Sequence, residues 1–312
     1  MRLKVSGTGS YVPEKIVSNH DLEELVDTSD EWIRERTGIR QRRVIGDETT
    51  TFMAAEAARR ALEDAKMQAS QVELIIMSTF TSDVLVPCGA CAVQKLIGAD
   101  HAACFDLNAA CTGFLTAYQT VQAYMEAGFC RTALIIGSES LSEVTDWSDR
   151  GTCILFGDGA GAAVVCADEG RGYLPVLHSM GEKGDALTCS SAFGGRDGKI
   201  RMDGQEVFRF AVRNVPEGIR EVLEKNGLDM DGVDGFLLHQ ANRRIVEAVA
   251  KRLGADPGKF PMNIQEYGNT SSASIPILLD ECRKKGMLKK GGTYVMAGFG
   301  GGLTWGASVL TL

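Results

Sequence analysis

The chain has 312 residues, of which 44% are hydrophobic, and its formal net charge is −8 at pH 7. This acidic balance argues against nucleic acid as the main partner, because such binding depends on neutralising phosphates. The length is sufficient for roughly two domains of about 150 residues, or for one duplicated fold.

Nine cysteines are scattered through the sequence without regular spacing, and no apolar signal segment precedes them. No stretch approaches the roughly 20 consecutive apolar residues that span a membrane. We therefore expect a cytoplasmic protein with reduced thiols and no membrane contact.

Apolar runs of strand length alternate with segments of helical periodicity, which is typical of an α/β protein. We predict strands at 72–77, 103–107, 132–136, 162–166, 236–238 and 294–296, and helices at 51–65, 113–127, 206–226, 243–253 and 274–285. The glycines of Gly7-Thr-Gly9 lack the third glycine and following helix of a dinucleotide-binding loop, so we interpret them as a turn.

Cys88 and Cys91 lie just after Pro87, where a helix is expected to begin. Neither a second cysteine pair nor an accompanying histidine completes a zinc pattern. We interpret these two cysteines as small packing residues and expect no bound metal.

Short sequence matches suggest an internal repeat. Leu-Glu at 62–63 precedes one predicted strand by ten residues, and Leu-Glu at 223–224 stands in the same place before another. GAAVV at 161–165 recurs as GASVL at 306–310. The matches occur in the same order, which indicates a duplication.

We infer halves at 1–168 and 169–312, each with a strand followed by a turn of small residues. The turn lies around Cys111 in the first half and around Asn269 in the second. Equivalent elements of related halves meet near the pseudo-axis, so Cys111 and Asn269 should be neighbours at helix N-termini. His239 ends the strand equivalent to 72–77 and should point to the same place.

These three residues suggest nucleophilic chemistry. A helix N-terminus favours thiolate over thiol, and the small neighbours of Cys111 let a carbonyl approach backbone N–H donors. Taken singly, each residue has a plainer interpretation. A buried cysteine packs like a small hydrophobe, as we expect for the other eight cysteines. His239 can serve as a hydrogen-bonded polar residue at a strand end, and Asn269 as a turn or N-cap residue. Their joint placement favours a site.

Four separated motifs carry a family resemblance: DLNAACTGF, LLHQANRRI, EYGNTSSASIP and GFGGGLTWG. In this order they closely resemble the β-ketoacyl-[acyl-carrier-protein] synthase III family, the condensing enzymes that initiate fatty-acid synthesis. The resemblance covers the whole chain. It implies a thiolase-like, duplicated α/β/α/β/α five-layered fold and a homodimer.

The resemblance also implies a decarboxylative Claisen condensation. Cys111 would take an acyl group from acyl-CoA, with the N–H groups of Cys111 and Gly301 as the oxyanion hole. Malonyl-acyl carrier protein (malonyl-ACP) would then lose CO2 while neutral His239 and Asn269 donate hydrogen bonds to the enolate oxygen. Acyl-CoA and the ACP phosphopantetheine would be substrates, with no tightly bound cofactor and no metal.

Contacts with substrate and partner follow from the same resemblance. Adenine of CoA would stack between Trp32 and Arg150, near Arg36 and Thr37, although this segment by itself is typical of a solvated amphipathic helix. The pantetheine tunnel would be lined by Gly204, Phe208, Ala241 and Asn242. Gln205 stands where the family often has asparagine, so the contact of that asparagine with pantetheine is not carried over to Gln205. ACP would dock on the basic residues Arg243, Arg244, Lys251 and Arg252.

Val86 marks a departure from the family. Acetyl-selective members often have phenylalanine at this position, which reaches into the partner subunit's acyl pocket, so valine suggests room for longer or branched primers. Two alternative functions stay open: a condensing enzyme of specialised, polyketide-type metabolism, and a thiol-dependent acyl-CoA hydrolase in which histidine activates water.

Overall fold

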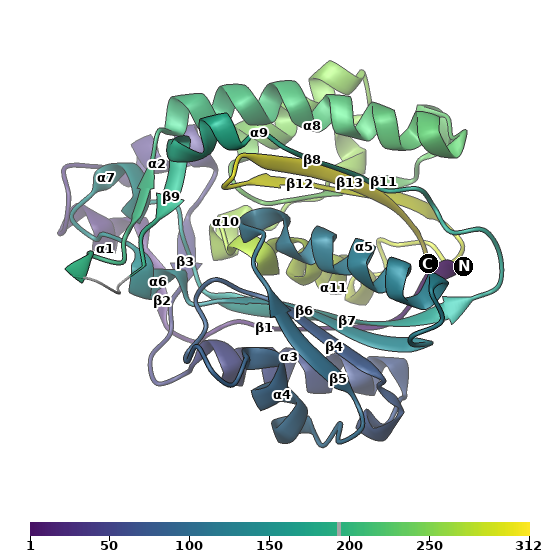
Figure 1. Cartoon of the computed structure of the whole chain (residues 1–312). Coiled ribbons are helices and arrows are strands. Elements are labelled where there is room, and N and C mark those ends of the chain that lie inside the picture. The colour runs from purple at the N-terminus through teal and green to yellow at the C-terminus, as the bar shows by residue number, and fades with distance from the viewer. Residues whose placement is uncertain (192–194) are drawn as a thin grey trace.

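The computed structural model of the chain describes residues 1–191 and 195–312. Within these residues the main elements stack as five alternating layers of helix and sheet (Figure 1). Two helices lie in the middle layer, between the two sheets, and other helices cover the outer face of each sheet. This is the five-layered arrangement expected from the family resemblance.

The first sheet has the strand order β5-β4-β6-β7-β1, and β1 also pairs in parallel with β13 (Thr304–Thr311) of the second sheet, at Lys4 and Thr311, so that hydrogen bonds join both sheets into one nine-stranded network. Strands β5, β4 and β6 are parallel, whereas β7 is antiparallel to both β6 and β1. Helices α3 and α4 cover its outer face (Figure 1). The bounds are β1 (Arg2–Tyr11), β4 (Leu74–Ser78), β5 (Ala103–Leu107), β6 (Thr132–Glu139), β7 (Gly159–Asp168), α3 (Thr50–Ala65) and α4 (Gly89–Ile97).

The second sheet repeats most of this pattern in the order β11-β12-β13-β8. Strands β11 and β12 are parallel, and β13 is antiparallel to β12 and β8, as β7 is to β6 and β1. Helices α8 and α9 cover the outer face (Figure 1). The bounds are β8 (Val176–Ser179), β11 (Gly235–Leu238), β12 (Thr293–Gly300), β13 (Thr304–Thr311), α8 (Gly204–Asn226) and α9 (Arg243–Leu253).

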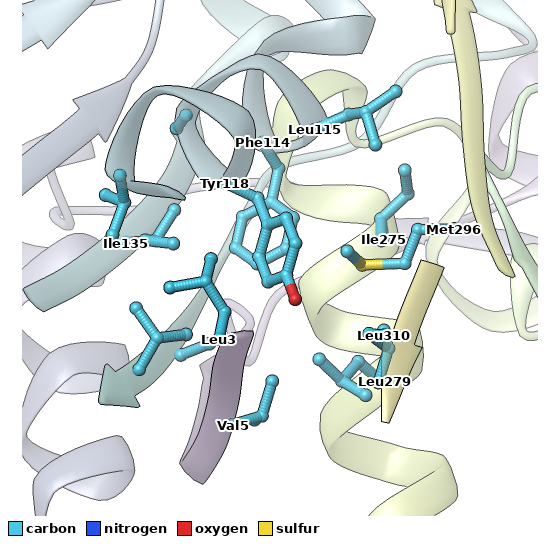
Figure 2. Packing of buried hydrophobic residues seen from close by; sticks show 14 of the residues in the cluster. Leu3, Val5, Phe114, Leu115, Tyr118, Ile135, Ile275, Leu279, Met296 and Leu310 are labelled. Atoms are coloured by element: carbon cyan, nitrogen blue, oxygen red, sulfur yellow. The ribbon is translucent and has the colours of Figure 1, made fainter. Parts of the chain in front are cut away.

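The middle layer holds α5 (Gly113–Glu126) and α11 (Ser274–Lys284). Figure 2 shows aromatic side chains of α5, Phe114 and Tyr118, among apolar residues of α11 and of strands from both sheets. Each fully buried side chain of this kind contributes about 1.5–3 kcal/mol. This core therefore fixes α5 and α11, and with them the turns from which both helices begin.

Those turns are single 3-10 turns, η2 (Ala110–Thr112) before α5 and η7 (Ser271–Ala273) before α11. Ala110 and Ser271 occupy the same position in each turn, and both have a positive φ, +46° and +49°. The repeat is incomplete, because α10 (Ile264–Tyr267) precedes Asn269 where we predicted a strand. Asn263 and the hydroxyl of Tyr267 bond to Glu281, which holds this segment against α11.

The remaining elements include a cap beside the two sheets, where the guanidinium of fully buried Arg42 bonds to the carbonyl oxygens of Val17 and Ile154 and to the side chain of Asn19.

No described helix combines the length and apolar character needed to cross a bilayer. The short elements are β2 (Ile16–Ser18), α1 (Asn19–Glu23), α2 (Asp30–Thr37), β3 (Gln41–Arg43), η1 (Ala69–Gln71), α6 (Leu141–Val144), α7 (Arg150–Cys153), η3 (Gly181–Ala186), β9 (Leu187–Cys189), β10 (Ile200–Met202), η5 (Met230–Gly232) and η6 (Pro257–Lys259).

Each helix and strand predicted from apolar periodicity is present, with ends shifted by a few residues. The turn predicted at Gly7-Thr-Gly9 is wrong, because these residues lie inside strand β1. A methyl group on Gly7 would lie 2.4 Å from the carbonyl oxygen of Ala61, and one on Gly9 would lie 2.3 Å from that of Ala57. These glycines therefore let α3 lie against the strand.

Candidate functional site

Cys111 lies in the η2 turn between β5 and α5, at the centre of the molecule, and is 8% exposed. The backbone of Gly300, the last residue of β12, packs directly against it. A methyl group on Gly300 would come within 2.9 Å of both Cβ and N of Cys111. Cys111 lines two cavities, a narrow one of about 70 Å³ and a larger one of about 860 Å³.

The thiol of Cys111 is protonated in the resting site. Burial raises the pKa of Cys111 to about 12, and a hydrogen bond with the Ser271 hydroxyl only partly offsets this. The sequence argument that the helix N-terminus favours thiolate is thus outweighed by desolvation. Cys111 needs a group that accepts its proton when it attacks.

His239 follows directly after β11 and is 2% exposed. Its Nδ1 atom lies 2.6 Å from the hydroxyl oxygen of Ser274, and the edge of Phe299 packs against its ring. Ser274 Oγ also accepts the backbone N–H of Gln240, and its own proton is available to Nδ1. In that tautomer the ring proton resides on Nε2. Burial lowers the pKa of His239 to about 3, so the ring is a neutral hydrogen-bond donor.

Asn269 lies just before the η7 turn and is also buried. Its backbone N–H donates to Leu155 and its backbone oxygen accepts from Gly157. The side-chain oxygen accepts the N–H of Ser271 at 2.9 Å, which leaves the amide NH2 group as a donor. His239 and Asn269 thus both offer N–H groups, and neither carries charge.

Cys111, His239 and Asn269 all line the narrow cavity, so the structure brings together the three residues singled out in the sequence. The four residues assigned to a pantetheine tunnel line the same cavity: Gly204, Phe208, Ala241 and Asn242. We call this cavity the narrow passage, because it is lined both by the thiol and by the residues assigned to the tunnel.

The larger cavity shares Cys111, Phe156 and Leu187 with the narrow one. Gly301 lines it together with the cysteine, next to Ala110. Apolar side chains that include Phe80, Leu141, Val144, Phe156 and Ile200 form much of its wall. Val86 does not line it and is 87% exposed, although its neighbour Leu85 does.

Trp32 on α2 packs against two guanidinium groups. The Cζ atoms of Arg36 and Arg150 are 4.8 and 4.9 Å from the centre of its ring. Thr37 differs from expectation: it is 2% exposed, and its hydroxyl donates to the carbonyl oxygen of Ile33 at 2.6 Å. The hydroxyl of Thr37 is thus engaged inside α2.

The basic residues assigned to α9 do not all face solvent. Arg243 is half-buried and reaches the backbone oxygen of Arg34 on α2. The guanidinium of Arg244 lies 5.3 Å from the ring of Phe208, which lines the narrow cavity. The exposed members of the set are Arg244, Lys251 and Arg252.

Several residues of the site were missed from the sequence. Ser271 was assigned only to a turn and Ser274 only to the start of a helix, and Glu139 was not singled out, although GSES after an apolar strand could have drawn attention to it. Arg209 and Arg213 were overlooked within the periodicity of α8. They line a groove of about 670 Å³ with Phe208 and Arg252, beside the narrow cavity.

Cys88 caps the N-terminus of α4, and its Sγ atom lies 3.4 Å from that of Cys91. The carboxylate of Asp106 accepts the first backbone N–H groups of this helix, from Gly89 and Ala90. In the described part of the chain, no three His, Cys, Asp or Glu side chains are grouped in a way that could hold a metal ion.

Comparison with known proteins gives matches along the whole chain. The family model for 3-oxoacyl-[acyl-carrier-protein (ACP)] synthase III matches residues 105–181, and the model for the C-terminal part of that synthase matches residues 223–312. The chain is 48% identical to β-ketoacyl-[acyl-carrier-protein] synthase III of Clostridium acetobutylicum, over 99% of this chain and 98% of the relative.

Solved structures agree with these matches. The 3-oxoacyl-[acyl-carrier-protein] synthase III of Aquifex aeolicus superposes with a TM-score of 0.96 at 44% identity, covering 99% of this chain and 100% of the other. The priming β-ketosynthase of the R1128 polyketide biosynthetic pathway superposes with a TM-score of 0.95 at 38% identity, covering 100% and 96%.

Proposed function

The chain belongs to the 3-oxoacyl-[acyl-carrier-protein] synthase III family, and we propose that it condenses an acyl-CoA primer with malonyl-ACP. The products are 3-ketoacyl-ACP, CoA and CO2, and the reaction begins fatty-acid synthesis. The observation that supports this most strongly is the placement of Cys111, His239 and Asn269 around one narrow cavity.

In the first half-reaction, Cys111 attacks the thioester carbonyl of acyl-CoA. Negative charge develops on the carbonyl oxygen, and the backbone N–H groups of Cys111 and Gly301 are assigned to bind it. The acyl chain occupies the larger cavity, which Cys111 and Gly301 both line. CoA then leaves through the narrow passage.

In the second half-reaction, malonyl-ACP places its pantetheine in that passage. Loss of CO2 gives an enolate whose oxygen takes hydrogen bonds from His239 Nε2–H and the Asn269 amide. Because both donors are neutral, neither forms an ion pair with the malonyl carboxylate that must leave. The enolate carbon attacks the acyl-cysteine. Thioester substrates supply all the reacting groups, so no tightly bound cofactor takes part.

A thiol hydrolase would use its histidine differently. It needs a basic imidazole that activates water, with an asparagine that orients the ring. Here Ser274 holds the His239 ring, the amide oxygen of Asn269 is occupied by Ser271, and burial lowers the pKa of His239 to about 3. This geometry favours condensation.

A condensing enzyme of specialised metabolism stays a second candidate, because a priming polyketide ketosynthase is among the structural relatives. The two functions differ in carrier and primer rather than in chemistry. Competition between a fatty-acid ACP and a polyketide ACP, each loaded with malonate, would separate them.

The central test uses intact-protein mass spectrometry. Wild type and Cys111→Ala are mixed with a panel of acyl-CoAs and then chased with malonyl-ACP. We expect an acyl adduct on wild type alone, which is discharged as ketoacyl-ACP only after the chase. Equal labelling of both proteins, or loss of the adduct to water without the chase, would contradict the proposal.

For CoA we propose that adenine inserts between Trp32 and Arg150 and displaces the guanidinium that now lies 4.9 Å from the centre of the indole ring, with Arg36 on the nucleotide side. Indole and guanidinium faces are suited to stacking on a purine. Thr37 then acts by ending α2 and not by direct contact, because its hydroxyl is engaged. The pantetheine follows the four residues that line the narrow passage.

For ACP we propose docking on the exposed cations beside the passage, Arg244, Lys251 and Arg252. The adjoining groove adds Arg209 and Arg213 to this surface. An acidic carrier meets local positive charge here although the chain as a whole has a net charge of −8. Arg243 contributes by holding α9 against α2.

We further propose a cytoplasmic homodimer. Strand β5 is the edge of its sheet, and Phe105 on this strand stacks with Tyr124, which contacts the exposed Phe129. An exposed edge strand beside aromatic side chains suits pairing with a second copy. Val86 lies in an exposed loop, from which a larger side chain at this position would reach a partner, so valine suits primers longer or more branched than acetyl.

We also propose that the repeat divides at 168 and 169. Strand β7 ends at Asp168, and β8, which pairs in the second sheet as β1 does in the first, starts at Val176. The first half then carries Cys111, and the second carries His239 and Asn269.

A further inference from the structure

Glu139 is a buried carboxyl group beside the nucleophile for which the mechanism above has no use. It is the last residue of β6, is fully buried and lines neither cavity. Its hydrogen-bond partners in the described chain are hydroxyl and amide groups. An isolated buried carboxylate is costly, so its retention here calls for a reason.

The two oxygens of Glu139 face different parts of the site. Oε2 accepts hydrogen bonds from the loop after β4, from Thr79 Oγ1 at 3.2 Å, Phe80 N at 3.2 Å and Thr81 Oγ1 at 2.7 Å. Oε1 lies 2.9 Å from Ser272 Oγ and 3.4 Å from Ser271 Oγ, both in the η7 turn.

The Ser271 side chain also lies beside the Cys111 thiol: both residues line the larger cavity, and hydrogen bonding to the Ser271 hydroxyl lowers the pKa of that thiol. Ser271 Oγ is thus placed to relay a proton between the sulfur and Glu139 Oε1. Ser272 bonds to the same carboxylate oxygen, but its second partner is the backbone oxygen of Ser78 and not the thiol.

The charge state of Glu139 suits a proton acceptor. Burial raises the pKa of Glu139 to about 7, against the hydrogen bonds that lower it. The titratable groups that sense its charge are Cys111 on the η2 turn and Cys189 on β9, and its charge raises the pKa of both thiols. His239 is a poorer acceptor, because Ser274 occupies its Nδ1 atom and its Nε2 carries the proton.

We propose that Glu139, acting through the hydroxyl of Ser271, receives the proton of Cys111 when the cysteine is acylated. This inference rests on the proposed function. The Sγ proton passes to Ser271 Oγ while the Ser271 hydroxyl proton passes to Glu139 Oε1. Sγ forms the bond to the acyl carbon, the carbon–sulfur bond to CoA breaks, and the CoA sulfur leaves with that electron pair and takes a proton from water.

The second half-reaction reverses the path. When the enolate attacks, the bond between the acyl carbon and Sγ breaks, and the departing sulfur recovers its proton from Glu139 through Ser271. Glu139 is therefore neutral while the anionic malonyl group and enolate are present, which avoids like-charge repulsion in the site. It begins and ends each cycle ionised. Because it acts through Ser271, it is a positioning residue.

The first test compares Ser271→Ala with the matched control Ser138→Ala, a buried serine whose hydroxyl donates to the carbonyl oxygen of Thr50. Alanine fits the backbone of residue 271, since Ala110 has almost the same φ at the equivalent position. Single-turnover acylation by butyryl-CoA should slow about a hundredfold in Ser271→Ala, as expected for loss of a proton acceptor. The control should stay within about threefold of wild type, in line with its position outside the path.

Decarboxylation of malonyl-ACP by unacylated enzyme gives a readout that needs His239 and Asn269 but no thiolate. It should be nearly unchanged in Ser271→Ala, because Asn269 is held by the backbone N–H of Ser271 and not by its hydroxyl. Equal loss of acylation and decarboxylation would assign these residues a structural role and overturn the proposal. So would acylation of Ser271→Ala at the wild-type rate.

The second test is the pH profile of Glu139→Gln. A glutamine amide can keep its oxygen toward Thr79, Phe80 and Thr81 and donate to Ser272, whose hydroxyl can turn to the oxygen of Ser78. Wild-type acylation should rise with pH through about 7, whereas the variant should be slower and lack this rise. An unchanged profile would overturn the proposal, while wild type that never becomes acylated would instead refute the proposed function.

Discussion

The Nδ1 atom of His239 lies 2.6 Å from the hydroxyl oxygen of Ser274, so the first residue of α11 holds the imidazole and Asn269 does not. The same hydroxyl accepts the backbone N–H of Gln240 and can donate its own proton to Nδ1. The arrangement leaves Nε2–H free for the enolate oxygen. The serine thus fixes the tautomer that the second half-reaction requires.

Ser274→Ala should therefore weaken decarboxylation and leave acylation intact. Without the hydroxyl, the ring can rotate or place its proton on Nδ1, and we expect malonyl-ACP decarboxylation to fall about tenfold, corresponding to roughly one lost hydrogen bond. Stopped-flow detection of CO2 release, set against single-turnover acylation of the same protein, measures the two steps. An equal decrease in both would show that Ser274 serves the fold and not the tautomer.

Gly300→Ala should abolish acylation. The added methyl group would lie 2.9 Å from Cβ and N of Cys111, against the buried turn that holds the nucleophile. We expect no acyl adduct and a loss of about 1–3 kcal/mol in the free energy of unfolding, as for other overpacked cores. Gly232→Ala is the matched control, because a methyl group there meets no atom within 4 Å. A normal acyl adduct on Gly300→Ala would contradict the close packing.

Trp32→Ala should affect only substrates that carry the nucleotide. If adenine stacks on this indole, its loss should raise KM for acyl-CoA about tenfold, since a base–aromatic stack contributes about 1–3 kcal/mol. The acyl thioester of N-acetylcysteamine has no adenine, and kcat/KM for it should stay at the wild-type value. An equal loss of kcat/KM with both substrates would indicate that Trp32 acts by stabilising α2 and not by binding adenine.

Much of the site was accessible from the sequence because its residues occupy element ends. Cys111 follows the largely apolar edge strand β5 and His239 follows the buried strand β11, and the two turns meet as the repeat predicted. The spacing could not show that Asn269 follows a helix, since short segments such as 264–267 are decided by tertiary contacts to Glu281.

Burial was the other property hidden from the sequence. The local argument from a helix N-terminus predicted a thiolate at Cys111, whereas full desolvation raises the pKa of the thiol to about 12. Glu139 was missed for the same reason, because only the folded structure shows that it lies one side chain behind the nucleophile. Likewise, Thr37 matches the family motif, but its hydroxyl is already bonded inside α2.

Lys251→Glu should weaken the step that uses ACP and spare the step that uses acyl-CoA. Lys251 is exposed near the end of α9, and charge reversal there opposes an acidic partner. We expect KM for malonyl-ACP to rise about fivefold to tenfold at low salt, with a smaller effect at high salt because of screening. Lys290→Glu makes the same charge change in an exposed turn and should leave KM unchanged. Equal effects of both variants would argue against a defined docking surface.

The pH dependence of stability should report the buried carboxyl group directly. Burial raises the pKa of Glu139 to about 7 in the folded protein, above its unfolded value near 4.5. Between these values the folded state binds more protons, so this contribution to stability is present at low pH and is lost as pH rises through 7. Glu139→Gln cannot titrate and lacks this contribution.

Relative to Glu139→Gln, wild type should therefore lose about 2 kcal/mol in the free energy of unfolding between pH 5 and pH 8. Urea titrations of both proteins across this range measure the difference, and all other titrating groups cancel in the comparison, including neutral His239. A difference that stays constant with pH would mean that Glu139 does not change its protonation state in this range. It would also remove the acceptor on which the Ser271 path depends.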